Sequence, residues 1–291
     1  MANLIGINLA MQTPFNEDGS VNYVRWEELI DIYVDAGVHG LVLGSGTGQH
    51  PYLTEGECNK LYEIGIRRID ERCNAICQSS ALNMNEVIRR SQTAKGQGAV
   101  AVMILPPYFE GPTDDDGLFE FYREIDGAID IDIVGYNIPQ STGLSVSLAL
   151  LNRLSELPNF NYIKDSSGDL NVHQAYIQAG AVKVLSGADP ITIYAFMAGA
   201  VGAIWGCANY MPRECVRLWD LISTKDYAGA LALWNKMIPS IIWMWSNDYM
   251  PGIKSAVRMR GYEGGPVRKP LHPISAEGEK VLAATLDHLD K

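Results

Sequence analysis

Two side chains able to carry out covalent and proton-transfer chemistry stand at the ends of apolar segments. Lys164 ends the segment Tyr162-Ile163-Lys164, and Tyr136 lies near the end of a run that begins at Ile131. Burial disfavours the charged form of a lysine amine, so an amine that points into a protein is better able to attack a carbonyl carbon. A tyrosine hydroxyl can transfer protons at the same reacting group. The two residues therefore favour nucleophilic attack on a carbonyl group, with Lys164 as the nucleophile and Tyr136 as the residue that transfers protons.

Each of these residues also has a purely structural interpretation. A lysine at the end of a strand can extend its amine into solvent, and a buried tyrosine commonly has a hydrogen-bonded hydroxyl. Lys183 is a second lysine within an apolar run, but it lies four residues before Gly187, toward the beginning of that run. If the runs are strands of a parallel barrel, chemistry takes place at their carboxyl ends, which favours Lys164 over Lys183.

A glycine-rich segment follows the apolar run that begins at Gly40. Residues 44–49 read GSGTGQ, which lacks the third glycine of the G-x-G-x-x-G fingerprint, and no Gly-Lys-Ser/Thr follows. A phosphate loop is therefore a poor match. Backbone N–H groups around Ser45, Gly46 and Gly48, together with the Thr47 hydroxyl, suit a smaller anion such as a carboxylate. With a lysine opposite, the simplest predicted substrate is a 2-oxo acid.

Eight apolar runs of strand length recur along the 291 residues, and they begin near residues 4, 40, 75, 99, 131, 160, 182 and 201. Near-continuous apolar runs suit strands that are buried on both faces of a parallel sheet. Amphipathic helical patterns lie between them, for example over Tyr23–Ala36, Thr54–Ile69 and Leu82–Gly96. Eight strand–helix units predict an α/β fold, the closed (β/α)₈ TIM barrel. An open doubly wound sheet is the alternative, but its glycine-rich turn is missing after the first run.

The last part of the chain predicts a different organisation. Helical patterns cover Asp226–Met244, Asp248–Arg260 and Ser275–Leu289, with a break at Gly264-Gly265-Pro266. We therefore expect residues 1–225 to form the catalytic barrel and residues 226–291 to form a C-terminal helical extension packed on it.

Composition excludes several classes of partner. The net charge is −11 and no basic run occurs, so neither nucleic acid nor an anionic membrane is an expected partner. No stretch of about 18 apolar residues and no signal-peptide pattern is present, so we expect a cytoplasmic protein. The five cysteines are expected to be reduced, and the scattered histidines and carboxylates show no metal-ligand spacing.

In their order along the chain, several motifs resemble the dihydrodipicolinate synthase / N-acetylneuraminate lyase family of class I aldolases. The resemblance covers nearly the whole length. The motifs are Thr13-Pro14-Phe15, Ser45–Gln49, Pro107-Tyr108, Tyr136-Asn137-Ile138-Pro139, Ile163–Asp169, Leu185–Asp189 and Gly265–Leu271.

The resemblance implies a (β/α)₈ barrel that uses no metal and no organic cofactor and assembles as a homotetramer, a dimer of dimers. Lys164 matches the lysine that forms an imine with the keto carbon of pyruvate or a longer 2-oxo acid, and Tyr136 matches the tyrosine that relays protons. Thr47, with neighbouring N–H groups, matches the grip on the substrate carboxylate. The remaining positions that the resemblance places around the substrate are Ile204, Gly187, Asp189, Ser141 and Tyr108.

Three positions depart from the synthase pattern. Gly46 stands where the family usually has a threonine or serine that relays a proton to the tyrosine. Phe109 stands where the synthases place a second tyrosine that reaches a neighbouring subunit. Ser141 stands where they carry the arginine that binds the aldehyde substrate's carboxylate. Asp189 is retained at a sugar-binding position of the lyases, but Pro190 and other neighbours differ.

These departures favour a Schiff-base lyase acting on a 2-oxo acid, by aldol cleavage or by condensation with pyruvate. A dehydratase of a 3-deoxy-2-oxo sugar acid, working through the same lysine imine, is the first alternative. A 4-hydroxy-tetrahydrodipicolinate synthase and a non-catalytic keto-acid-binding barrel are the others. Retention of both Lys164 and Tyr136 argues against the binding barrel, because binding alone needs neither residue.

Overall fold

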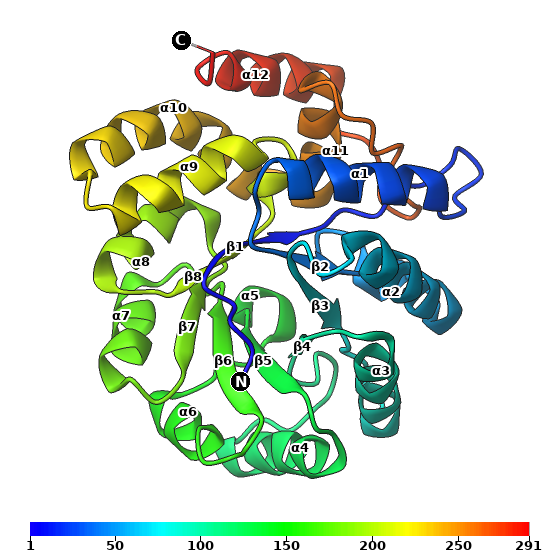
Figure 1. Cartoon of the computed structure of the whole chain (residues 1–291), viewed down its shortest axis with the longest axis vertical. Coiled ribbons are helices and arrows are strands. Elements are labelled where there is room, and N and C mark those ends of the chain that lie inside the picture. Colours follow the sequence, from blue (N-terminus) through cyan, green and yellow to red (C-terminus); the bar gives the residue numbers. More distant parts are fainter. Residues whose placement is uncertain (291) are drawn as a thin grey trace.

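The computed structural model describes residues 1–290, and its eight strands close into one parallel barrel in chain order. Figure 1 shows this barrel with helices around it, which confirms the expected (β/α)₈ fold. The strands are β1 (Gly6–Ala10), β2 (Gly40–Leu43), β3 (Asn74–Gln78), β4 (Ala101–Ile104), β5 (Asp132–Asn137), β6 (Phe160–Asp165), β7 (Lys183–Ser186) and β8 (Gly202–Trp205).

Helices alternate with the strands, and short 3₁₀ turns follow β2, β7 and β8. The α-helices of the barrel are α1 (Tyr23–Asp35), α2 (Glu55–Ile69), α3 (Met84–Gln97), α4 (Asp115–Ala128), α5 (Pro139–Thr142), α6 (Leu148–Leu154), α7 (Leu170–Ala179), α8 (Thr192–Ala198) and α9 (Pro212–Ser223). The 3₁₀ turns are η1 (His50–Tyr52), η2 (Asp189–Ile191) and η3 (Cys207–Asn209). The first three helices begin and end within two residues of the sequence patterns.

The start of α2 shows how the local sequence fixes the residue at which a helix begins. The Thr54 side chain accepts a hydrogen bond from the Glu57 N–H, and the Glu57 carboxylate accepts one from the Thr54 N–H. This reciprocal capping box satisfies backbone donors that an α-helix leaves free at its first turn.

The apolar core has two layers. One fills the space between the strands and the surrounding helices. The other lies inside the barrel and includes Val42, Ile76, Met103, Val134, Tyr136, Tyr162, Leu185 and Ile204. Side chains alternate between the two faces of a strand. In β6, Tyr162 belongs to the inner layer and Ile163 to the outer one, so Lys164 is directed back into the barrel.

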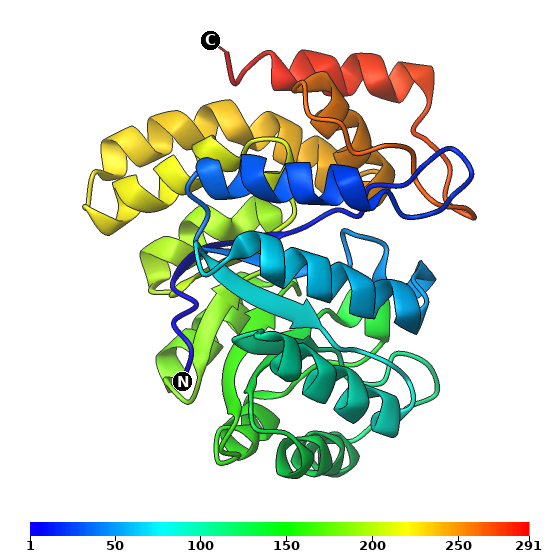
Figure 2. The same ribbon diagram turned by 45° about the vertical axis from the view of Figure 1, so that its right-hand side comes forward.

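Three further helices follow the barrel: α10 (Tyr227–Trp245), α11 (Tyr249–Met259) and α12 (Ala276–Leu286). They gather on the side of the molecule that carries α1 and α9, away from α4 and α6 (Figures 1 and 2). Helix α10 packs against α9 and η2, and α11 packs against η3. The helices of this C-terminal region therefore reach the turns that follow β7 and β8. Within residues 1–290, no helix is long and apolar enough to cross a membrane.

Candidate active site

Lys164 and Tyr136 meet at the carboxyl ends of adjacent strands. Their Cα atoms are register partners in the β5–β6 pair. The Lys164 Nζ lies 4.1 Å from the centre of the Tyr136 ring, and the lysine is only 6% exposed. Gly187, directly after β7, makes room for it, because a Cβ there would lie 2.5 Å from Lys164 Cε and 2.2 Å from Ser166 Oγ. A buried amine and an aromatic hydroxyl side chain thus share the mouth of the barrel.

The hydroxyl of Tyr136 differs from those of the other buried tyrosines. Those others all have hydrogen-bonded hydroxyls: Tyr33, Tyr62, Tyr122, Tyr162, Tyr176 and Tyr210. Tyr136 is also buried, yet none of the residues in the described part of the chain pairs with its hydroxyl. The Tyr136 hydroxyl oxygen keeps some solvent exposure, unlike the fully buried unpaired atoms, and an accessible free hydroxyl beside a lysine amine suits a group that bonds to substrate.

The glycine-rich segment forms a tight turn after β2. The Ser45 hydroxyl donates to the Met11 carbonyl at 2.9 Å and accepts the Gly48 N–H at 3.2 Å. The Gln49 N–H closes the turn on the Gly46 carbonyl at 2.9 Å. Within residues 1–290, nothing accepts a hydrogen bond from the N–H of Gly46 or of Thr47. These two donors and the Thr47 hydroxyl are therefore available to an anion, as a carboxylate grip requires.

Several strand-end hydroxyls lack partners as well. The side-chain oxygens of Thr13, Ser79 and Ser166 are buried and have no hydrogen-bond partner among residues 1–290. These residues follow β1, β3 and β6, so all three stand at the carboxyl end of the barrel. Unpaired buried polar atoms are rare in proteins. Their concentration at this end is consistent with a site for a polar ligand.

The other predicted site residues vary in how deeply they are buried and in how close they lie to Lys164. Ile204 belongs to the inner core of the barrel, and Gly46 is open, because a Cβ there would have no atom within 4 Å. Ser141 lies exposed on α5. Tyr108 lies on the side of α3, where burial raises its pKa and the nearby Arg90 charge lowers it. Within the described residues, no hydrogen bond joins Ser141 or Tyr108 to Lys164.

Asp189 is paired with a residue that the sequence patterns did not single out. Its carboxylate accepts a hydrogen bond from the Tyr249 hydroxyl at 2.6 Å, and it is 1% exposed. Burial raises its pKa to about 6, against the opposing effects of the Tyr249 hydrogen bond and the Lys164 charge. Tyr249 opens a helix that lies 60 residues further along the chain, so no local pattern could reveal the pair.

Lys254 is a second buried lysine that the sequence did not reveal. Burial lowers its pKa to about 7. Its amine donates hydrogen bonds to the carbonyls of Thr13 and Gly264, the latter at 2.6 Å, and it lies 5.1 Å from the centre of the Phe15 ring. In an amphipathic helix such a lysine looks like an ordinary surface residue. Because its donors are used by the two carbonyls, Lys254 fastens the C-terminal region to the loop after β1.

The C-terminal segment also holds the glycine-rich turn from outside. The Gln49 side chain accepts the Arg268 N–H at 2.9 Å and donates to the Arg268 carbonyl at 3.0 Å. The Arg268 guanidinium forms hydrogen bonds with the Glu57 carboxylate and with the Gly19 and Tyr52 carbonyls. One segment thus connects the loop after β1, the turn with Thr47 and the start of α2.

Acid is expected to weaken this connection. The Arg268 guanidinium lowers the pKa of Glu57 from 4.5 to about 2. Because the folded-state pKa lies below the ordinary value, the pair contributes stability above about pH 4.5 and loses it as the pH falls through about 2. In denaturant unfolding, the free-energy difference between the wild type and Glu57→Gln should shrink between about pH 6 and about pH 3. Glu55→Gln, in the more exposed pair with Arg89, is the control. A Glu57→Gln difference that does not change with pH would contradict the expectation.

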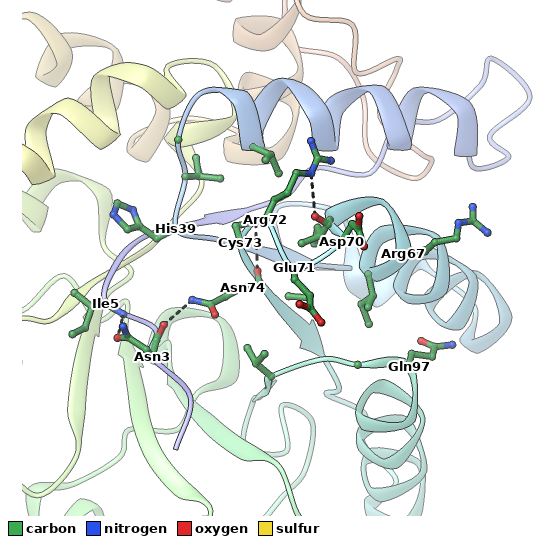
Figure 3. A pocket seen from close by; sticks show the side chains of 18 residues that line it. Asn3, Ile5, His39, Arg67, Asp70, Glu71, Arg72, Cys73, Asn74 and Gln97 are labelled. Carbon is green, nitrogen blue, oxygen red and sulfur yellow. Dashed lines mark hydrogen bonds between the residues drawn. The ribbon is translucent and has the colours of Figure 1, made fainter.

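A cavity of about 940 Å³ lies at the opposite end of the barrel, where the strands begin. Figure 3 shows its lining of backbone turns and polar side chains, among them Asn3, His39, Arg72 and Asn74. Burial raises the pKa of Cys73 in its wall to about 11, so this thiol is not an activated nucleophile. Of the residues that the structure describes, no three histidine, cysteine or acidic side chains are grouped so as to hold a metal ion. The catalytic residues predicted from the sequence all lie at the other end.

Comparison with known proteins assigns the chain to a family. Residues 3–289 match the model of the Dihydrodipicolinate synthetase family. The chain belongs to this family. The family comprises aldolase-type lyases that form a lysine imine with pyruvate, which agrees with the resemblance inferred from the motifs.

Individual members of the dihydrodipicolinate synthetase family match over nearly their whole length. The 4-hydroxy-tetrahydrodipicolinate synthase of Methanothrix thermoacetophila is 32% identical over 284 residues, which cover 97% of this chain and 95% of the relative. The 4-hydroxy-tetrahydrodipicolinate synthase of Bartonella bacilliformis is 29% identical, and the match covers 98% of each chain. The chloride-inhibited dihydrodipicolinate synthase of Acinetobacter baumannii, solved with pyruvate, superposes with a TM-score of 0.94 at 28% identity and 99% coverage of both chains.

Proposed function

We propose that this protein is a pyruvate-dependent, Schiff-base-forming aldolase whose nucleophile is Lys164. The observation that carries the proposal is the buried amine lying 4.1 Å from the ring of a tyrosine with a free hydroxyl. The 2-oxo acid places its carboxylate on the N–H groups of Gly46 and Thr47. The Lys164 amine forms a bond to the keto carbon, and the keto oxygen leaves as water. Residues 1–225 supply this catalytic barrel, and residues 226–291 form a helical extension packed on it.

The protonated imine then acts as an electron sink. Loss of a proton from the neighbouring carbon gives an enamine, which forms a carbon–carbon bond with an aldehyde. In the reverse direction, that bond breaks and the aldehyde leaves. Tyr136 accepts the proton lost from the carbon next to the imine and donates a proton to the aldehyde oxygen as the carbon–carbon bond forms, and it takes that proton back in the cleavage direction. Hydrolysis of the imine releases the product and restores the free amine, so no metal or organic cofactor takes part in the proposed cycle.

The activity is tested by offering pyruvate with a panel of aldehydes, and separately a set of 4-hydroxy-2-oxo acids and 3-deoxy-2-oxo sugar acids. Consumption of pyruvate in the first assay, or its release in the second, supports the aldolase. Conversion of a sugar acid to a new 2-oxo acid without pyruvate release identifies the dehydratase instead. Absence of turnover in every assay would leave a keto-acid-binding barrel.

A 4-hydroxy-tetrahydrodipicolinate synthase is the second candidate, because the relatives compared above carry that name. Against it stands Ser141, whose short neutral side chain cannot form the bidentate ion pair that an arginine forms with a carboxylate. The open position at Gly46 likewise lacks the relay hydroxyl. These two positions give a direct test of the two candidates.

Restoring both side chains in the double variant Gly46→Thr/Ser141→Arg is expected to raise condensation with aspartate semialdehyde by about tenfold or more, since one charge-assisted bond contributes about 1.5–3 kcal/mol. The threonine fits because nothing lies within 4 Å of a Cβ at Gly46. The double variant Gly46→Thr/Ser141→Lys, with a charge but no bidentate fork, is the control and should gain less. Equal rates in the wild type and both variants would show that these positions do not select the aldehyde.

We further propose that the enzyme works in the cytoplasm as a homotetramer, a dimer of dimers. One structural relative, 26% identical with a TM-score of 0.93, is described as a monomeric dihydrodipicolinate synthase variant. Sedimentation velocity of the purified chain distinguishes the two states: a tetramer supports the proposal, and a monomer refutes it.

A further inference from the structure

A tyrosine from the C-terminal region enters the barrel mouth between the ends of β7 and β8. Tyr249 begins helix α11, and its hydroxyl donates to Asp189 in the turn after β7. A Cβ built on Gly206, the residue that follows β8, would lie 2.1 Å from the same hydroxyl oxygen. The tyrosine hydroxyl is therefore pressed against the backbone at the end of β8 while it bonds to the turn after β7.

Asp189 holds this tyrosine in place. The carboxylate is almost completely buried, and it is close enough to Lys164 for the lysine charge to lower its pKa. With one oxygen engaged by the Tyr249 hydroxyl, the aspartate presents little surface of its own. Tyr249 is half-buried, so of this pair only the tyrosine has surface that a ligand could contact.

The two sides of the mouth differ in how much room they leave. Gly187 follows β7 and Gly206 follows β8, and neither position has room for a Cβ. Lys164 occupies that space at Gly187, and Tyr249 occupies it at Gly206. Beside β2, Gly46 has open space where its Cβ would be. At the ends of β7 and β8, Tyr249 from outside the barrel thus takes space that a side chain at position 206 would need.

We propose that Tyr249 is a specificity-determining residue that shortens the pocket beside β7 and β8 and favours small aldehyde partners over long polyhydroxylated ones. Asp189 is its positioning residue. The inference rests on the proposed aldolase function, in which the keto acid is fixed between Thr47 and Lys164. A partner of the size of acetaldehyde or glycolaldehyde fits beside the tyrosine, whereas the chain of a sugar aldehyde collides with its ring.

The test compares kcat/KM for pyruvate with glycolaldehyde and with a hexose aldehyde in the wild type, Tyr249→Ala, Tyr249→Leu and Tyr249→Phe. Because both substrates are measured on the same variant, their ratio cancels a general loss of active enzyme. The long-to-short ratio should rise by about tenfold or more in the alanine variant and less in the leucine variant, the scale of pocket-size discrimination by apolar contacts. Tyr249→Phe keeps the bulk of the ring, so the ratio of kcat/KM for the long aldehyde to that for the short one should stay low.

Tyr194→Ala, at an exposed tyrosine of α8, is the matched control and should leave the ratio unchanged. An unchanged ratio in folded Tyr249→Leu and Tyr249→Ala, judged by thermal unfolding, would overturn the inference. Should the alanine variant fail to fold, the leucine variant alone decides between the outcomes. Failure of the proposed function is distinguishable, because the wild type would then turn over neither aldehyde.

Discussion

Replacing Lys164 by alanine is expected to abolish covalent capture of pyruvate and to lower kcat/KM by about three orders of magnitude or more, as the loss of a catalytic nucleophile does. The amine is the only group in the proposed cycle that bonds to the keto carbon, and no neighbouring side chain can replace it. The measurement is reduction with sodium borohydride in the presence of pyruvate, followed by peptide mass spectrometry. The wild type should carry one reduced adduct at Lys164, and the variant should carry none.

Two other lysines are the controls for this experiment. Lys183 also lies in a strand, but its amine is 3.4 Å from the Tyr162 hydroxyl, in the part of the barrel where strands begin. Lys254 is buried, but its amine is occupied by two carbonyls. Lys183→Ala should therefore retain the adduct and the turnover. An adduct mapped to Lys183 or Lys254 in the wild type would refute the assignment of the nucleophile.

Replacing Tyr136 by phenylalanine is expected to lower kcat by about 10²–10⁴-fold, the usual contribution of a positioned proton donor and acceptor. The ring that packs on the lysine is kept and only the hydroxyl is lost, so the borohydride adduct at Lys164 should still form. Chemistry after imine formation should slow. Single-turnover measurements separate the two stages and are the decisive readout for this variant.

Tyr122→Phe is the matched control, because it removes a buried hydroxyl that donates to the Ile104 carbonyl outside the barrel interior. It should cost about 1 kcal/mol of stability, the usual value of one hydrogen bond, and leave kcat unchanged. The interpretation of Tyr136 as a proton carrier is wrong if its phenylalanine variant behaves in the same way.

Much of the fold could be predicted from local sequence. Strands buried on both faces leave continuous apolar runs, and their alternation with amphipathic helices predicts a parallel barrel. The position of a polar residue within an apolar run was also informative about the site, because a polar residue at the carboxyl end of a barrel strand lies where ligands bind. That reasoning selected Lys164 over Lys183 and placed Tyr136 beside it, and the register of β5 and β6 brings the two side chains together.

The state of individual polar groups could not be predicted in this way. Whether a tyrosine hydroxyl is free depends on acceptors from other strands, and the free hydroxyl of Tyr136 is visible only once every neighbour is in place. The openness of Gly46 and the crowding of Gly187 are likewise indistinguishable in sequence, since both are glycines that follow a strand. Only the packed barrel separates them.

The sequence by itself therefore determined the barrel, the position of the candidate nucleophile Lys164 and the glycine-rich turn, because each of these depends on residues close together in the chain. Only the tertiary structure decided how the C-terminal region takes part. Tyr249, Lys254 and Arg268 contact residues 60, 241 and 219 positions away. Such pairs leave no periodicity in the sequence, since they form only when α11 and the segment after it pack over the ends of the strands.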